Sequence, residues 1–306
     1  MFIKPLFAAL AGALMLATMP AQAIDITHDL GTTTVPDAPQ RIVVLEYSFV
    51  DSLAAVGVAP VGIADDDRRE SIIPTYTAVI GDDWTSVGTR KSPSLEVIAS
   101  LQPDLIIADT SRHEAIYGAL SEIAPTIAFD SLTGTYQTAM DAAQTIADAI
   151  GKGPEMAERL KTHAATMEAF KAEIGDVSGW SAQFIIDNGE AIFLHSPVSY
   201  NGSLLNWFGF TNNMPTPDGH SYEEAIVQTS LEQLSEINPQ IIIRGKYADN
   251  ALTDSWIGQP VYDAIAAVKA GNVFDVTAHE WSRLRGVLAS EKSAADLVEI
   301  VKKLKR

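Results

Sequence analysis

The feature that most constrains the fold is a stretch of sequence that occurs twice. Residues 94–107 and 230–243 each begin Ser-Leu-Glu, run for two or three helical turns, and reach a proline followed by apolar residues. Serine is a favoured N-cap, and proline ends a helix before the next strand. Any capped helix before a buried strand looks similar, but the shared register argues against coincidence. The repeat therefore predicts two similar α/β lobes.

The intervening segments fit the same architecture. Short apolar runs at residues 42–45, 58–64 and 105–108 predict buried strands, and residues 49–56 predict a helix after the first of them. Strands that alternate with helices form βαβ units. Such units build mainly parallel sheets with helices on both faces. We expect this α/β arrangement in both lobes.

A long amphipathic helix is predicted between the lobes. Its inner face would be formed by Met156, Leu160, His163, Met167, Phe170 and Ile174. Spacings that alternate between four and three residues place these side chains along one face, and residues 154–174 would span about 30 Å. The predicted organisation is a first lobe at 24–152, a connecting helix at 153–176 and a second lobe at 177–306. One helical connection favours modest closure over a wide hinge motion.

The first 23 residues have the pattern of a secretory signal peptide. Lys4 precedes an apolar run at residues 6–19, and an Ala-Gln-Ala sequence ends at Ala23 as a cleavage site. The run is too short to favour a transmembrane span. The chain has no cysteine, which removes disulfides, thiolate metal sites and a lipid attached to cysteine. We expect a monomeric periplasmic protein, exported by a cleavable signal peptide, with no direct membrane anchor.

The charge of the chain narrows the class of ligand. A formal net charge of -18 argues against binding nucleic acid or an anionic membrane surface. An acidic protein that captures an anion must gather its few cations in one place. Half of the ten arginines follow apparent strands, where open parallel sheets bind their ligands. These five are Arg90, Arg112, Arg244, Arg283 and Arg285.

Guanidinium groups make paired hydrogen bonds to carboxylates and stay charged when partly buried. The five arginines therefore predict an anion site in a cleft between the lobes. The alternative for each arginine is a solvated side chain or a local pair with an aspartate.

Aromatic, hydroxyl and imidazole groups accompany the arginines and are predicted to bind the same ligand. They are Tyr47, Ser48, His113, Tyr247 and Trp281. For Tyr47 and Trp281, packing in the core is an equal alternative. His113, His195 and His279 lie near strand ends, but no pair of metal ligands is spaced to share a helix face. We therefore expect no metal site on the protein.

Signatures of catalysis are missing from the sequence. There is no G-x-S-x-G elbow, no phosphate loop and no H-E-x-x-H motif. The sequence thus favours a binding protein over an enzyme.

With these residues assembled, the chain resembles a known family. The similar segments in the first lobe are residues 41–49, 51–56, 62–66, 86–90, 93–96 and 103–113; those in the second are 194–195, 202–203, 281–286 and 294–296. They resemble the periplasmic binding proteins that serve siderophore, haem and cobalamin importers. Within that family they are most similar to the ferric dicitrate-binding members.

The resemblance implies a ferric carboxylate chelate held by arginines, with iron carried only as part of the ligand and no other cofactor. It also implies an ABC permease as partner, which docks onto Glu96 and Glu232, at equivalent positions of the repeat. Each glutamate also places favourable charge at a helix N-terminus. Residues 197–201 and those after Ile243 depart from the ferric dicitrate pattern, so a larger citrate-based siderophore is an open alternative. A haem or cobalamin carrier and a secreted chelate-processing hydrolase are further alternatives.

Overall fold

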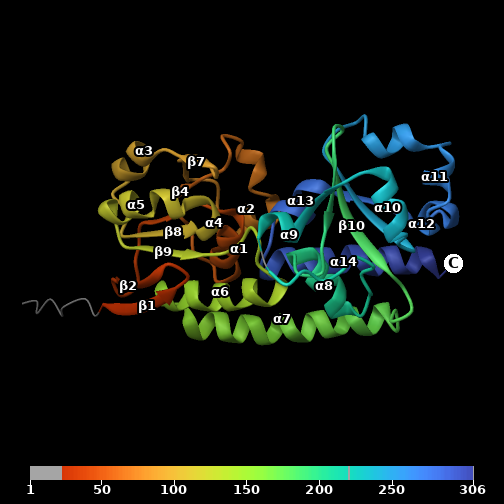
Figure 1. Ribbon diagram of the computed structural model, residues 1–306. Helices are drawn as coiled ribbons and strands as arrows, with labels where there is room; N and C mark the ends of the chain where they lie inside the picture. Colours follow the sequence, from red (N-terminus) through yellow and green to blue (C-terminus); the bar gives the residue numbers. More distant parts are fainter. Residues whose placement is uncertain (1–22, 220, 306) are drawn as a thin grey trace, which may run out of the picture.

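The computed structural model describes residues 23–219 and 221–305. The predicted signal peptide lies outside this part except for Ala23. Two lobes stand side by side along one long helix, α7 (Gly153–Ile174) (Figure 1). Within the described part, no helix has the length and apolar character needed to cross a bilayer.

The first lobe is built on a five-stranded parallel sheet in the order β5-β4-β3-β8-β9. Its strands are β3 (Ile42–Val44), β4 (Gly62–Ile63), β5 (Thr85–Ser86), β8 (Leu105–Asp109) and β9 (Thr126–Phe129). Its helices are α1 (Tyr47–Ala55), α2 (Pro74–Ile80), α3 (Leu95–Ser100), α4 (Thr110–His113), α5 (Tyr117–Ile123) and α6 (Tyr136–Ala149). Two hairpins, β1 (Ile24–His28) with β2 (Gly31–Val35) and β6 (Gly88–Thr89) with β7 (Ser92–Pro93), and two short turns, η1 (Arg69–Ser71) and η2 (Glu114–Ile116), complete it.

The second lobe also has a five-stranded sheet, in the order β12-β11-β10-β13-β14. Its strands are β10 (Ala182–Asp187), β11 (Ile192–His195), β12 (Ile226–Thr229), β13 (Ile241–Lys246) and β14 (Val273–Thr277). β10, β13 and β14 are parallel, whereas β11 and β12 are antiparallel to their neighbours. Its helices are α8 (Tyr200–Phe208), α9 (Tyr222–Ala225), α10 (Leu231–Ile237), the 3-10 turn η3 (Leu252–Trp256), α11 (Pro260–Asp263), α12 (Ala266–Ala270), α13 (Ala278–Arg283) and α14 (Val287–Leu304).

The sequence repeat is also a structural repeat. The hydroxyl groups of Ser94 and Ser230 accept hydrogen bonds from the third backbone N–H of α3 and α10, as N-caps do. The residues before the two prolines, Gln102 and Asn238, both have left-handed backbones, with φ of 47° and 46°. The aliphatic triplets then enter β8 and β13. The predicted fold of two α/β lobes with mainly parallel sheets is confirmed.

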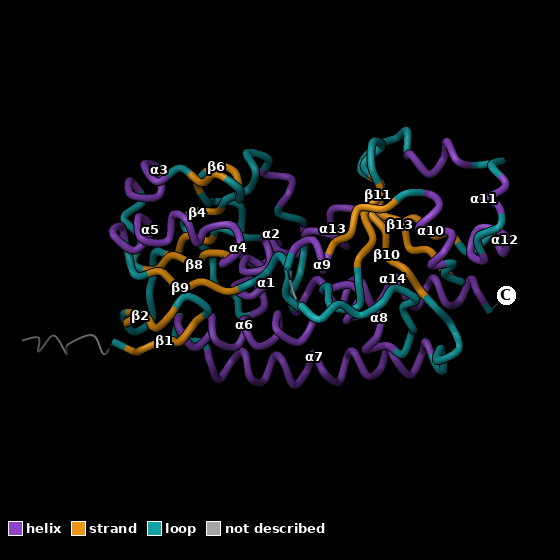
Figure 2. The backbone as a smooth tube through the Cα atoms, viewed as in Figure 1, coloured by secondary structure: helices purple, strands orange, loops and turns teal. Residues whose placement is uncertain are grey.

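Successive residues of the first-lobe strands point to opposite faces of the sheet and are buried on both. Ile42 and Val44 belong to one apolar cluster, whereas Val43 and Leu45 belong to another. Two-sided burial is typical of parallel sheets covered by helices. Because the strands are parallel, their carboxyl ends lie at the same edge of the sheet, and the two sheets occupy separate lobes (Figure 2).

The predicted long helix joins the lobes, and α14 adds a second connection. α14 packs against α7 and also against α1 and α6 of the first lobe. On α7, Arg159 donates two hydrogen bonds of 2.8 Å to Glu291 of α14. At the start of α14, the buried carboxylate of Asp51 on α1 accepts from the backbone N–H groups of Leu288 and Ala289, at 3.1 and 2.8 Å. The lobes are therefore held together at two places.

Candidate functional site

A cleft of about 530 Å³ opens between the lobes. The first lobe contributes Arg90, Arg112 and Leu132 to its lining. The second contributes Ile186, Asn188, Phe193, His195, Tyr222, Ile226, Tyr247, Ser282, Arg283 and Arg285. Four of the five predicted arginines thus share one cleft.

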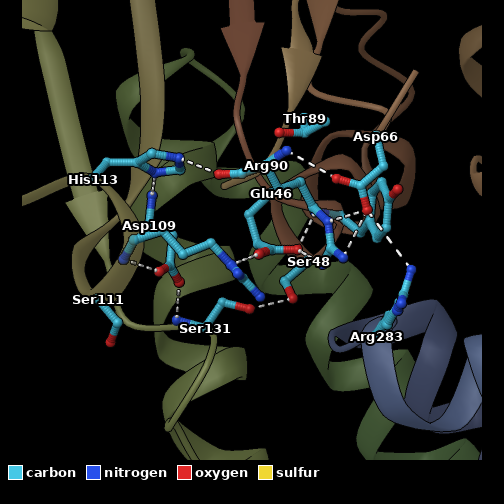
Figure 3. Close-up of polar contacts among 12 residues, drawn as sticks. Glu46, Ser48, Asp66, Thr89, Arg90, Asp109, Ser111, His113, Ser131 and Arg283 are labelled. Carbon is cyan, nitrogen blue, oxygen red and sulfur yellow. Dashed lines mark hydrogen bonds and ion pairs between the residues drawn. The ribbon is translucent and has the colours of Figure 1, made fainter. Parts of the chain in front are cut away.

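Two of these arginines are held in place by one buried carboxylate. Glu46, which directly precedes α1, is completely buried. One of its oxygens accepts from Arg90 and the other from Arg112, each at 2.8 Å (Figure 3). Burial opposes ionisation of Glu46, but the charges of Arg90 and Arg112 outweigh it and hold the pKa of Glu46 below its usual range. The pair of guanidinium groups is therefore fixed before any ligand arrives.

A second carboxylate bridges the lobes. Asp66 accepts from Nε and Nη2 of Arg90, at 3.1 and 2.9 Å. Its Oδ2 also lies 3.7 Å from Nη1 of Arg283 in the second lobe (Figure 3). The backbone of Asp66 has a φ of 59°, in the left-handed region that costs free energy for a non-glycine residue. The surrounding contacts hold Asp66 in the position where it joins the two arginines.

Arg285 is the arginine of the cleft that has no carboxylate partner among the described residues. Its side chain is 4% exposed, and its guanidinium donates to the carbonyl of Ser282 at 2.9 Å and lies 3.5 Å from the hydroxyl of Ser131. Among the described residues, no carboxylate lies within ion-pair distance of it. Burial lowers the pKa of Arg285. A buried cation without a paired anion favours binding of an anionic ligand.

A third carboxylate lies beside the arginines without forming an ion pair with them. The side chain of Asp109 accepts from the backbone N–H groups of Arg112 and Ser131, both at 2.9 Å. Burial, reinforced by the nearby charge of Glu46, raises the pKa of Asp109 to about 6. The four guanidinium groups of the cleft thus exceed the carboxylates around them, and the site keeps a net positive charge.

Four of the predicted ligand-binding residues lie behind the cleft lining instead of in it. The guanidinium of Arg90 stacks 4.0 Å from the ring centre of the buried Tyr47. Ser48 is hydrogen-bonded to Ser131 at 2.6 Å. Tyr47 thus helps to position Arg90, and Ser48 helps to position Ser131.

The other two are also fully engaged. Nδ1 of His113 accepts from the N–H of Asp109 at 2.9 Å, so Nε2 donates to the carbonyl of Arg90 at 2.8 Å. Trp281 is 1% exposed and donates from Nε1 to Asp296 at 2.9 Å. The structure thus places these four side chains behind the cleft lining, and their contact with a ligand stays a prediction.

Arg244 lies outside the cleft, contrary to the prediction. The strand was expected to end at Ile243, but β13 continues to Lys246 because it is hydrogen-bonded to both β10 and β14. Arg244 thus lies within the strand, and its guanidinium donates at 2.7 Å to Asp254 and to Asp275. Arg244 is a locally paired arginine, the alternative considered for each arginine.

Tyr247 and Arg283 form one rim of the cleft, as predicted. The guanidinium of Arg283 lies 4.9 Å from the ring centre of Tyr247. The hydroxyl of Tyr247 is hydrogen-bonded to Ser282 and donates to the carbonyl of Ala278. Tyr247 remains 39% exposed, which leaves ring surface for a ligand.

The two predicted docking glutamates are exposed in the first turns of equivalent helices. Glu96 lies on α3 and Glu232 on α10. Both helices are on the side of the lobes that faces away from α7 (Figure 1). The two positions could therefore be reached by one partner that approaches that side.

The structure also contains site residues that the sequence did not single out: Glu46, Asp66, Phe193 and Tyr222. Over the described residues, no group of three or more histidine, aspartate or glutamate side chains is arranged to hold a metal ion.

Comparison with known proteins gives consistent results. The family model described as "Periplasmic binding protein" matches residues 42–279. The Fe(3+)-citrate-binding protein YfmC of Bacillus subtilis is 39% identical over 277 residues, which cover 90% of this chain and 85% of the relative. The Fe(3+) dicitrate-binding periplasmic protein FecB of Escherichia coli is 38% identical over 299 residues, which cover 98% and 96%.

Solved structures are similar as well. SirA of Staphylococcus aureus, in complex with staphyloferrin B, superimposes with a TM-score of 0.77 at 26% identity. The match covers 91% of this chain and 98% of that one.

Proposed function

Because this chain belongs to the periplasmic binding protein family, we propose that it is the substrate-binding component of an ABC iron importer. It captures an anionic ferric carboxylate chelate in the cleft between its lobes. The observation that carries this proposal is the set of four arginines in one cleft, of which Arg285 has no carboxylate partner among the described residues. Carboxylate oxygens of a ligand would supply the missing acceptors.

The relatives support the choice of ligand. The names of the two similar proteins reported above describe binding of ferric citrate and ferric dicitrate. They describe binding proteins, in agreement with the prediction that this chain is not an enzyme. They give no support to a haem carrier, a cobalamin carrier or a hydrolase. The proposed ligand is therefore ferric citrate or the ferric complex of a citrate-based siderophore.

Iron would be bound as part of the chelate. The cleft lining offers guanidinium groups, aromatic rings and one buried histidine, a set suited to the anionic surface of a chelate more than to a bare cation. The protein would thus recognise the carboxylates around the metal and need no cofactor of its own.

Delivery would use Glu96 and Glu232. Both are exposed, in equivalent first turns, and on the same side of the molecule as α3 and α10. Arginines of an inner-membrane permease would pair with them. A monomer that leaves both lobe tips uncovered suits this role, and export to the periplasm places it next to the permease.

Titration of the purified protein with ferric citrate tests the proposed ligand. Tryptophan quenching or native mass spectrometry should give one bound chelate per chain, and hydroxamate and catecholate chelates should bind more weakly. Substituting Arg283→Ala together with Arg285→Ala should weaken ferric carboxylate binding at least tenfold, because two charge-assisted contacts are lost. An unchanged titration curve would remove these arginines from the ligand site.

Charge reversal tests the docking role. Glu96→Arg with Glu232→Arg should leave chelate binding unchanged and abolish uptake in cells that depend on this carrier. The matched control is Glu236→Arg, which reverses a charge later on α10. Normal uptake by the double variant would show that docking uses other residues.

A further inference from the structure

The two walls of the cleft differ in chemistry. Arg90 and Arg112 come from the first lobe, Arg283 is the last residue of α13, and Arg285 lies between α13 and α14. Another part of the lining comes from the sheet of the second lobe and is largely apolar.

The strand register explains the apolar wall. Ile186 of β10 is paired with Phe193 of β11, and His195 of β11 is paired with Ile226 of β12. Cross-strand partners, and residues two apart on one strand, point to the same face of a sheet. These four residues therefore form one continuous surface. We call it the apolar platform: Ile186, Phe193, His195 and Ile226.

The histidine does not add charge to the apolar platform. His195 is 2% exposed and packs against the ring of Phe184, with 4.7 Å between ring centres. Burial, with a contribution from Arg285, lowers the pKa of His195 to about 3. At neutral pH the platform is therefore uncharged.

Exposed aromatic side chains border the platform. Only five large hydrophobic side chains in the described part are classed as exposed, and two of them, Tyr222 at 44% and Tyr247 at 39%, line this cleft. Exposed apolar surface that is gathered in a concave site indicates a surface that a ligand covers.

We propose that the preferred ligand is an amphipathic ferric chelate, whose carboxylates face the arginines and whose hydrocarbon skeleton lies on the apolar platform. This inference rests on the proposed function, which concerns the carboxylates of the ligand, and adds a hydrocarbon part. A chelate made of citrate alone presents polar groups in all directions and would leave Phe193 and Ile226, the partly exposed side chains of the platform, in contact with water. A chelator in which an alkyl chain joins citrate units would cover it and gain the free energy of apolar burial.

A matched pair of probes tests this step. Both chelators carry two citrate units joined through amides to a diamine; one uses pentanediamine, and the other has the central methylene of that linker replaced by an ether oxygen. Their ferric complexes have the same charge and length, so the arginines cannot distinguish them. The wild-type protein should bind the all-methylene probe at least about fourfold more tightly, the effect of burying one methylene group.

Two variants locate the preference. Phe193→Asn should bring the ratio of the two affinities to about one. Tyr222→Asn should reduce the ratio as well. Because Tyr222 is exposed, this substitution should have little effect on the stability of the fold. Ile257→Asn is the matched control, since Ile257 is 68% exposed and lies outside the cleft; it should keep the wild-type ratio.

The outcomes separate this inference from the proposed function. If the wild-type protein binds ferric citrate but gives equal affinities for the two linked probes, or binds neither of them, the amphipathic ligand is excluded and the proposed function stands. If Phe193→Asn and Tyr222→Asn both keep the wild-type ratio, the apolar platform is not the contact surface. If the folded wild-type protein binds no ferric carboxylate at all, both proposals fail.

Discussion

Two buried arginines of the second lobe, Arg244 and Arg285, have opposite surroundings. Arg244 is 8% exposed and donates to Asp254, Asp275 and the hydroxyl of Thr253. Arg285 is 4% exposed and, among the described residues, has only neutral oxygen atoms within hydrogen-bond distance. Arg244 lies within β13 and Arg285 follows α13, and only Arg285 borders the cleft.

The difference teaches that compensation of charge, more than burial or position after a strand, distinguishes a structural arginine from a binding one. The carboxylates next to Arg244 already satisfy its guanidinium. The guanidinium of Arg285 is fixed in the cleft, and protein oxygens accept only some of its N–H groups. The remaining N–H groups are preorganised to bind an anion. Three experiments address this contrast.

The largest effect is expected for Arg285→Met. Chelate affinity should fall about a hundredfold, because a buried charged contact to the ligand is worth several kcal/mol. The free energy of unfolding should change by less than about 1 kcal/mol, because no carboxylate loses an ion-pair partner. Isothermal titration and urea unfolding followed by tryptophan fluorescence measure the two quantities. Retained affinity would contradict the comparison.

Arg244→Met should give the opposite result. The free energy of unfolding should fall by about 1 to 2 kcal/mol, because Asp254 and Asp275 lose their guanidinium partner while water partly replaces it. Their side chains are 39% and 46% exposed, which limits the loss. Chelate affinity should stay within twofold. A tenfold weaker titration with unchanged stability would place Arg244 in the binding site after all.

The smallest effect concerns pH and Asp109. Its pKa of about 6 lies above the usual aspartate value because the site is buried, so Asp109 is ionised at pH 7 and largely protonated at pH 5. Loss of that negative charge beside Glu46, Arg112 and Arg285 should strengthen anion binding several-fold as pH falls through 6. Asp109→Asn should remove this increase.

Measuring wild type and Asp109→Asn with the same chelate at each pH cancels titration of the ligand itself. If the two proteins show the same pH profile, the carboxyl group of Asp109 does not contribute to the charge of the cleft.

Much of the fold could be predicted from the sequence, because its signals are local. The capped repeats, the prolines after them and the amphipathic connecting helix each follow from neighbouring residues. The end of β13 does not follow from neighbouring residues. The apolar run ends at Ile243, but pairing with strands on both sides extends the strand to Lys246. Hydrogen bonds from β10 and β14, which are distant in the sequence, therefore set the end of β13. They also place Arg244 within the strand and outside the cleft.

The candidate site could be predicted only in part, because several of its contacts join residues that are far apart in the sequence. The arginines could be found because cations are rare in this chain. Glu46 could not, because it is one of many acidic residues and lies 44 and 66 positions from the arginines that it holds. Phe193 could not be assigned to the cleft either, since β11 is apolar at Ile192, Phe193 and Leu194 and therefore gives no alternation to read.

The connection made by α14 has a consequence for how the chain reaches its native state. Leu284 and Ala289 belong to the apolar core of the first lobe, and Asp51 of that lobe accepts hydrogen bonds from two backbone groups of α14 as well as from the hydroxyl of Tyr76. A buried carboxylate without these donors is costly, so the first half of the polypeptide cannot complete its tertiary structure alone. The first lobe therefore completes its core only when residues 284–289, in the C-terminal part of the chain, have been synthesised.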